Sequence, residues 1–211
     1  MIISHKKRFI FFACGKTGTT SIEQILSPYH DDKKITEKTG QRLEELRKQY
    51  GRPFNPKHVR PSLIREMAGE AIWHSYLKVA FVRNPWDWVV SNFYFNFQYM
   101  GRYISQFDTD HVNAVYYFMA LHNQTVETES YFQHPFVFDR DGEKLVDFVG
   151  RFENLQDDFN AMCKMIDVEP AMLPVTNSSR HRHYKELYTR QAKDLVARYY
   201  TDDIALLDYS F

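Results

Sequence analysis

Residues 9–25, FIFFACGKTGTTSIEQI, contain the pattern that most constrains the fold of this chain. The apolar run 9–14 has the length and the Phe and Ile content of a buried strand. A loop of small residues, 15–19, follows, and from Thr20 onward apolar side chains recur with helical spacing. A strand, a small-residue loop and a helix present backbone N–H groups and a positive helix end to an anion. The pattern therefore predicts a site for a phosphorylated or sulfated ligand.

The side chains of the loop support the same prediction. Lys16 adds a positive charge, and hydroxyl groups come from Thr17, Thr19, Thr20 and Ser21. The common nucleotide phosphate loop reads G-x-x-x-x-G-K-[ST], and Ile10 stands where its first Gly would fall. An ordinary ATP or GTP loop is therefore disfavoured. The alternative without a ligand is a Gly- and Thr-rich turn with a solvated lysine.

Composition limits the classes of partner. The 211 residues are enough for one domain, 1–211, with a full hydrophobic core. The 27 basic and 27 acidic residues cancel, so we expect neither a nucleic-acid nor a membrane partner. Cys14 and Cys163 are too few and too far apart for a disulfide framework or a zinc site, which indicates buried thiols. Without a signal peptide or a long apolar run, a cytoplasmic location is the simplest expectation.

The order of predicted elements indicates an α/β fold. A second buried strand, 78–83, is followed by Asn84 and Pro85, which suit the cap and the first turn of a helix. Residues 135–149 are predicted to form a hairpin, and helices are predicted at 37–50, 62–68, 112–122 and 155–166 and in one last segment after 183. The interleaved Lys, Arg and Glu residues of 33–48 indicate a solvated helix face. We therefore expect a single domain with a mostly parallel central sheet flanked by helices.

The string KTGTTS resembles the 5′-phosphosulfate loop of sulfotransferases that use 3′-phosphoadenosine 5′-phosphosulfate (PAPS). In that family a Lys and the small residues after it cradle the sulfate donor. The resemblance implies the P-loop-like sulfotransferase fold, with PAPS as co-substrate and no metal. It assigns donor binding to Lys16, Thr17, Gly18, Thr19, Thr20 and Ser21. Gly15 replaces the Pro that usually precedes the Lys, which loosens the loop.

A second segment, FVRNPWDWVVSNF, resembles the 3′-phosphate motif of the same family, in which an Arg and a Ser eight residues later bind the phosphate. Here these residues are Arg83 and Ser91, and both types suit phosphate, one through a planar fork and one through a hydroxyl. The family often has another Arg where this chain has Trp88. The alternative is a structural Arg–carboxylate pair beside a buried Ser.

Weaker likenesses extend over most of residues 8–211. GRFENLQDDF resembles a strand-to-helix segment that places Phe152 near the adenine, although a core Phe is the alternative. In the late loop 173–184 the resemblance suggests contacts from Ser179 and His181. The G-x-x-G-x-x-K segment of the small-molecule enzymes is absent, so the chain is more similar to the heparan and chondroitin branch. The implied acceptor is a carbohydrate or another hydroxylated metabolite, and the sequence does not specify the oligomeric state.

The chemistry requires two catalytic groups. Lys16 can neutralise charge on the bridging oxygen of the donor, and a general base must remove the proton of the acceptor hydroxyl. His58, in a Pro-bounded loop before the second strand, is our choice of base, with Lys57 beside it as a contact for acceptor or sulfate. His74 and Glu66 are the alternatives. Two further functions stay open: a non-catalytic nucleotide-binding module and an NTP-dependent kinase.

Overall fold

The chain divides into two compact units. The structure is a computed structural model that describes residues 1–51, 55–100, 132–176 and 182–211. One unit, here called the sheet unit, comprises residues 1–82 and 135–176. The other, the helical unit, comprises residues 83–134 and 177–211. That 1–211 form one domain stays a prediction.

The sheet unit is built on four strands in the order β1-β2-β3-β4. Strand β2 (Phe9–Phe12) pairs in parallel with β3 (Leu77–Val82), which pairs in parallel with β4 (Phe148–Arg151). Strand β1 (Ile2–Ser4), which the sequence analysis missed, pairs antiparallel with β2. The FIFF and VAFV runs are buried throughout, as expected of strands covered on both faces. The α/β class with a mostly parallel sheet is confirmed.

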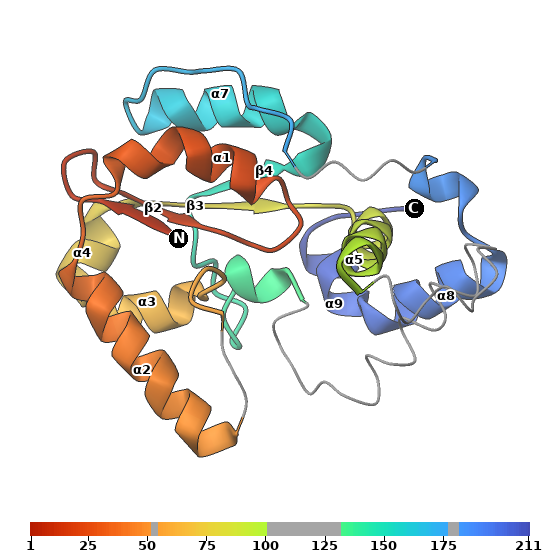
Figure 1. The fold of residues 1–211 in the computed structure, drawn as a ribbon, viewed down its shortest axis with the longest axis horizontal. Helices are drawn as coiled ribbons and strands as arrows, with labels where there is room; N and C mark the ends of the chain where they lie inside the picture. The colour runs from red at the N-terminus through yellow and green to blue at the C-terminus, as the bar shows by residue number, and fades with distance from the viewer. Residues whose placement is uncertain (52–54, 101–131, 177–181) are drawn as a thin grey trace. The chain divides into compact units, whose positions relative to one another are not determined.

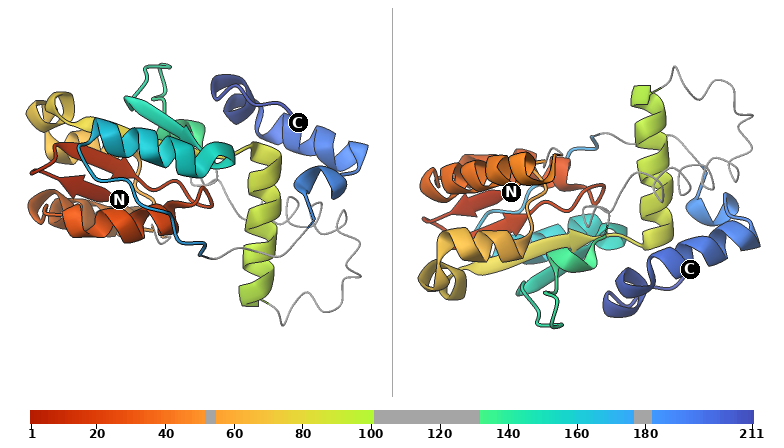
Figure 2. Two further views of the ribbon diagram at one scale, coloured as in Figure 1. Left: turned by 90° about the horizontal axis from the view of Figure 1, so that it is seen from above. Right: turned by 90° about the horizontal axis from the view of Figure 1, so that it is seen from below.

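Helices cover both faces of this sheet. Figures 1 and 2 show α1 (Thr19–Leu26) and α7 (Leu155–Met165) over one face, and α2 (Lys34–Tyr50), α3 (Pro61–Ala68) and α4 (Glu70–Ser75) over the other. The core on the first face joins strands to helices through Phe11, Ile22, Phe81, Phe159 and Met162. Both cysteines are buried free thiols, as predicted, and burial raises the pKa of Cys163 to about 11.

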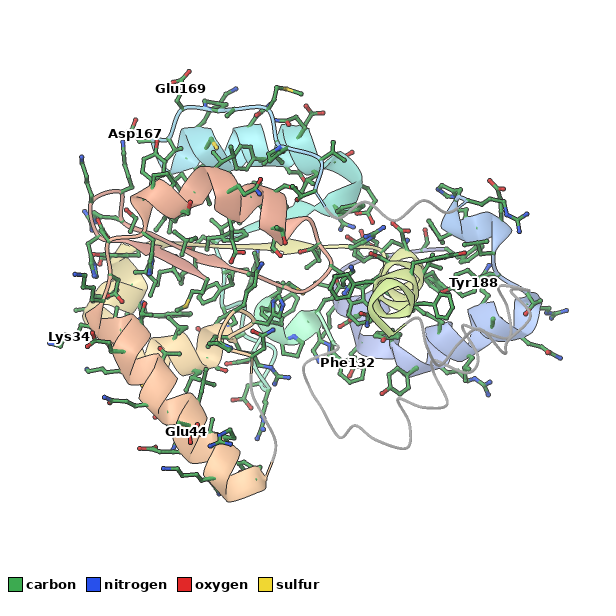
Figure 3. The ribbon with its side chains drawn as sticks, viewed as in Figure 1. Lys34, Glu44, Phe132, Asp167, Glu169 and Tyr188 are labelled. Atoms are coloured by element: carbon green, nitrogen blue, oxygen red, sulfur yellow. The ribbon has the colours of Figure 1, made fainter. Side chains whose placement is uncertain are left out.

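Helix α2 presents the predicted solvated face. Lys34 and Glu44 project from it in Figure 3, and both are exposed. Glu44 accepts hydrogen bonds from Arg47 at 2.7 Å, an exposed pair one helical turn apart. Exposed pairs of this kind contribute little to stability because solvent screens them, so the face serves solvation more than stability.

The predicted hairpin at 135–149 forms in part. An antiparallel bridge joins Phe138 to Lys144, with bonds from the Leu145 N–H to the Val137 carbonyl at 2.7 Å and from the Asp139 N–H to the Glu143 carbonyl at 2.9 Å. The end of the segment, from Phe148 onward, instead belongs to β4, which pairs in parallel with β3. Gly150 makes this possible, since a Cβ at that position would lie 2.3 Å from the Phe81 ring.

The helical unit contains α5 (Pro85–Met100), α8 (Arg190–Tyr199) and α9 (Thr201–Leu206). Asn84 caps α5 as predicted, because its Oδ1 accepts the Trp86 N–H at 3.1 Å. The last predicted helix is two helices, which meet at Tyr200.

Aromatic rings form the core of the helical unit. Phe132, labelled in Figure 3, stacks on Tyr199 with ring centroids 5.4 Å apart. The predicted helix at 112–122 lies outside the described residues. Within the described ranges, no helix has the combination of length and apolar content that crossing a membrane requires.

We predict that Gly150→Ala destabilises the sheet unit by about 1–3 kcal/mol, because the new methyl group must displace the aromatic ring of Phe81 from a packed core. Gly40→Ala is the matched control. Gly40 is exposed within α2 and has open space around its Cβ position, so alanine should stabilise by about 0.5–1 kcal/mol. Denaturant unfolding of both variants measures the difference, and equal stability would contradict the packing argument.

Candidate active site

The loop between β2 and α1 turns through left-handed backbone. Lys16 has φ of +65° and Gly18 has φ of +77°. A left-handed lysine is uncommon, and such conformations persist only where the surroundings hold them. Here the Thr17 hydroxyl, fully buried, donates to the Cys14 carbonyl at 2.9 Å and closes the turn. Because that hydroxyl is engaged inside the loop, Thr17 can offer a ligand its backbone N–H rather than its side chain.

Gly18 is required at the end of this turn for two reasons. Its positive φ is strained for any residue with a side chain. A Cβ there would also lie 2.6 Å from Cδ2 of Leu155, at the start of α7. The loop therefore packs closely against Leu155 where it enters α1. Leu155 is a supporting residue that the sequence analysis placed only in a helix.

The first turn of α1 has the features typical of a helix end that binds an anion. Gly18 is its N-cap, and in the part of the chain that the structure describes no side chain caps this turn and no acidic residue lies in it. The N–H groups of Ser21 and Ile22 are used by the Gly18 carbonyl, at 3.1 and 3.3 Å. The N–H groups that precede them point out of the helix end, where the positive end of the helix dipole lies. Such an end favours a sulfate or phosphate group.

His58 lies against this loop. Its Nδ1 is 2.7 Å from the carbonyl oxygen of Ala13, the residue directly after the β2 segment. A carbonyl oxygen only accepts, so Nδ1 carries the proton and the neutral ring presents Nε2 as an acceptor. Nε2 and Cε1 both lie 3.8 Å from the Cβ position of Gly15. The structure thus brings the predicted base to the predicted anion loop, in the tautomer that a base requires.

Burial lowers the pKa of the His58 imidazole below its ordinary value of 6.5. The positive charges of Lys57 and of the Met1 amine lower the pKa further, while the bond to Ala13 and the charge of Glu23 oppose them. The neutral, basic form therefore predominates at pH 7. Half-protonation, and with it loss of the acceptor at Nε2 in half of the molecules, requires a pH below 6.5.

Lys57 is held beside the same helix end. Its Nζ lies 2.8 Å from Oε2 of Glu23 and donates to the Thr20 hydroxyl at 3.4 Å. Thr20 and Glu23 are three residues apart on α1 and share a face. Helical spacing from Thr20 could have placed Glu23 on this face of α1. Its ion-pair partner, Lys57, lies in a loop 34 positions away, which no local pattern indicates. Glu23 thus belongs to the site, although the sequence analysis did not name it.

The remaining residues of the predicted donor site in the sheet unit have separate surroundings. Thr19 and Ser21 are buried, and the Ser21 hydroxyl is 2.9 Å from that of Thr176. Phe152 is half-buried and begins a short 3-10 turn after β4. Ser179 and His181 lie outside the described residues.

Arg83 and Ser91 belong to the helical unit, and both are buried. Nε of Arg83 donates to Oδ2 of Asp87 at 2.7 Å. Asp87 and Ser91 are four residues apart on α5 and share a face of that helix, while Arg83 precedes the helix. The Arg–carboxylate pair weighed as the alternative is present, with Asp87 as the carboxylate that the sequence did not single out. Trp88, which replaces a common Arg, is a core residue whose ring lies 5.9 Å from that of Tyr200.

The whole chain matches one family model. Residues 1–210 match the model described as "Sulfotransferase family". The chain belongs to the sulfotransferase family. A carbohydrate-type branch fits this family, and the four-stranded, mostly parallel sheet is consistent with the sulfotransferase fold. Membership supports sulfuryl transfer as the general activity.

A relative of this sulfotransferase-family chain is an uncharacterized protein of Archaeoglobus fulgidus. It is 26% identical over 133 residues, which cover 59% of this chain and 96% of the relative. No solved structure matches the chain significantly. Among the described residues, no three His, Cys, Asp or Glu side chains are grouped so that they can hold a metal ion.

We predict that Gly18→Ala destabilises the protein by about 1–2 kcal/mol through its left-handed backbone alone. Gly15→Ala is the matched control three residues earlier, because Gly15 has no positive φ and a Cβ there makes ordinary contact with the His58 ring. Its stability should change by less than about 0.5 kcal/mol. Thermal unfolding followed by circular dichroism compares them. If the two substitutions cost the same, the turn does not depend on Gly18 in the way described.

Proposed function

We propose that this chain is a PAPS-dependent O-sulfotransferase that acts on a hydroxyl of a carbohydrate or another hydroxylated metabolite. The observation that carries the proposal is the bond from His58 Nδ1 to the Ala13 carbonyl, which points an unprotonated Nε2 at the edge of the anion loop. A non-catalytic nucleotide-binding module requires the anion loop but not a general base. The orientation of His58 therefore favours an enzyme over such a module.

Each group has a part in the transfer. The acceptor oxygen attacks the sulfur in line as Nε2 of His58 takes its proton, so the imidazole becomes cationic. The bond between sulfur and the bridging oxygen breaks, and its electron pair leaves with adenosine 3′,5′-bisphosphate. Lys16 and the N–H groups of the loop stabilise the charge on that leaving oxygen.

The donor's remaining groups are assigned by the sequence resemblance. Arg83 and Ser91 take the 3′-phosphate, and Asp87 supports this by fixing the Nε edge of the guanidinium. Phe152 stacks on the adenine. Ser179 and His181 keep the donor contacts that the resemblance implies.

The proposal predicts a strong preference for adenosine 3′,5′-bisphosphate over adenosine 5′-monophosphate and ATP, measured by isothermal titration calorimetry with and without Mg²⁺. A kinase would instead prefer ATP with Mg²⁺ and ignore the 3′-phosphate. Turnover with a panel of hydroxylated acceptors then separates an enzyme from a non-catalytic module. If the chain binds adenosine 3′,5′-bisphosphate but sulfates no acceptor of the panel, the non-catalytic module is the function that remains.

Lys16→Ala should lower kcat about 100-fold or more, because it removes a charge that matters most in the transition state. Binding of adenosine 3′,5′-bisphosphate should weaken far less. Lys34→Ala, on the exposed face of α2, is the control and should change neither quantity. Equal losses in kcat and affinity for Lys16→Ala would contradict a role at the leaving oxygen.

The His58 assignment predicts a particular pH profile. Because burial lowers the pKa of His58, kcat/KM should fall toward acid pH with the midpoint of that fall below the ordinary imidazole value of 6.5. His58→Ala should lower kcat by about 10²–10⁴-fold and abolish this acid limb. His74→Ala, an exposed histidine paired with Glu70, is the control. Near-normal turnover of His58→Ala with saturating acceptor would exclude His58 as the base.

A further inference from the structure

The backbone of Arg83 is clamped by the side chain of Gln133. The Arg83 N–H donates to Oε1 of Gln133 at 2.7 Å, and Nε2 of Gln133 donates to the Arg83 carbonyl at 2.8 Å. The two residues are 50 positions apart. The carboxamide of Gln133 thus pairs with both the N–H and the carbonyl of one residue. A neighbouring strand in a β-ladder makes the same two hydrogen bonds through its backbone. It fixes Arg83 directly after the last residue of β3.

Gln133 is fixed in turn by Asp203. Its backbone N–H donates to both carboxylate oxygens, at 3.0 and 2.9 Å. The backbone N–H of His134 donates to Oδ1 of Asp203 at 2.8 Å, and the imidazole Nδ1 of His134 lies 2.6 Å from the same oxygen. Asp203 is completely buried and Gln133 is 1% exposed. Groups buried to this extent are costly to leave without partners, so this connected set holds one arrangement.

The side chain of Arg83 has a separate support. Asp87, on the next helix, accepts from Nε at 2.7 Å. Main chain and guanidinium of the same residue are therefore held by two independent partners. Recognition of a phosphate by a planar, forked group depends on orientation, and small displacements of such a group weaken it.

We propose that Gln133, held by Asp203, is a positioning residue that sets the backbone of Arg83 for contact with the 3′-phosphate of the donor. This rests on the proposed function, in which Arg83 binds that phosphate. Gln133 touches no substrate. Its contribution is to the discrimination between a nucleotide with a 3′-phosphate and one without it.

The test measures, by calorimetry on the full chain, the ratio of the dissociation constants for adenosine 5′-monophosphate and adenosine 3′,5′-bisphosphate. Gln133→Met keeps the length of the side chain and removes both bonds, and should reduce this ratio about tenfold. Gln133→Glu keeps the acceptor for the Arg83 N–H but replaces the donor to the Arg83 carbonyl by a second oxygen, so it should also reduce the ratio. On an Arg83→Ala background, neither substitution should reduce the ratio further.

Gln191→Met, the same substitution at an exposed position of α8, is the control and should leave the ratio unchanged. A lower melting temperature with an unchanged ratio in the Gln133 variants would overturn the positioning role. If Gln133→Met does not fold, the ratio of Gln133→Glu decides by the same criterion. A parent chain with no preference, or an Arg83→Ala variant that keeps it, would instead overturn the proposed function.

Discussion

The left-handed turn that leads from β2 into α1 is the constraint on which the candidate site depends. Leu155 leaves no space for a side chain at Gly18, and Thr17 ties the turn back to Cys14. The chain must therefore enter α1 at Thr19 with its first-turn N–H groups facing outward. The same turn leaves the Ala13 carbonyl accessible to the ring of His58. The predicted anion loop and the position of the proposed base thus both result from one local backbone path.

The surroundings of His58 balance two opposing requirements. Burial keeps the ring neutral and ready to accept a proton at pH 7, but it also makes the ring a weaker base. The carbonyl of Ala13 and the charge of Glu23 act against burial, because both favour the cation that forms when the proton arrives. Lys57 shifts the balance back, although its ion pair with Glu23 reduces its effect. These surroundings therefore accommodate both the neutral ring and its cation, the two states that the proposed role as base requires.

Sequence patterns predicted the elements whose formation depends on neighbouring residues. The strand, loop and helix of 9–26, the β3 segment and the Asn84 cap all follow from neighbouring residues, and the structure confirms them. Pairing between distant segments was not predictable, so β1 was missed, and the hairpin predicted at 135–149 forms only around Phe138 and Lys144. Gln133 and Asp203 carry no motif, and their partners lie 50 and 70 positions away. Glu23 and Asp87 likewise act through contacts that a spacing pattern alone does not identify as functional.

The orienting group of His58 is a main-chain oxygen, and this affects how the site can vary in evolution. Where a carboxylate orients a histidine, one substitution can remove the acceptor, and the acidic residue becomes a recognisable feature of the family. A peptide carbonyl persists whatever side chain position 13 carries, provided that the turn keeps its path. Sequence drift at Ala13 can therefore leave the tautomer unchanged, and constraint shifts to the residues that shape the turn. Relatives can share this arrangement of the proposed base although a comparison of side chains alone does not reveal the group that orients it.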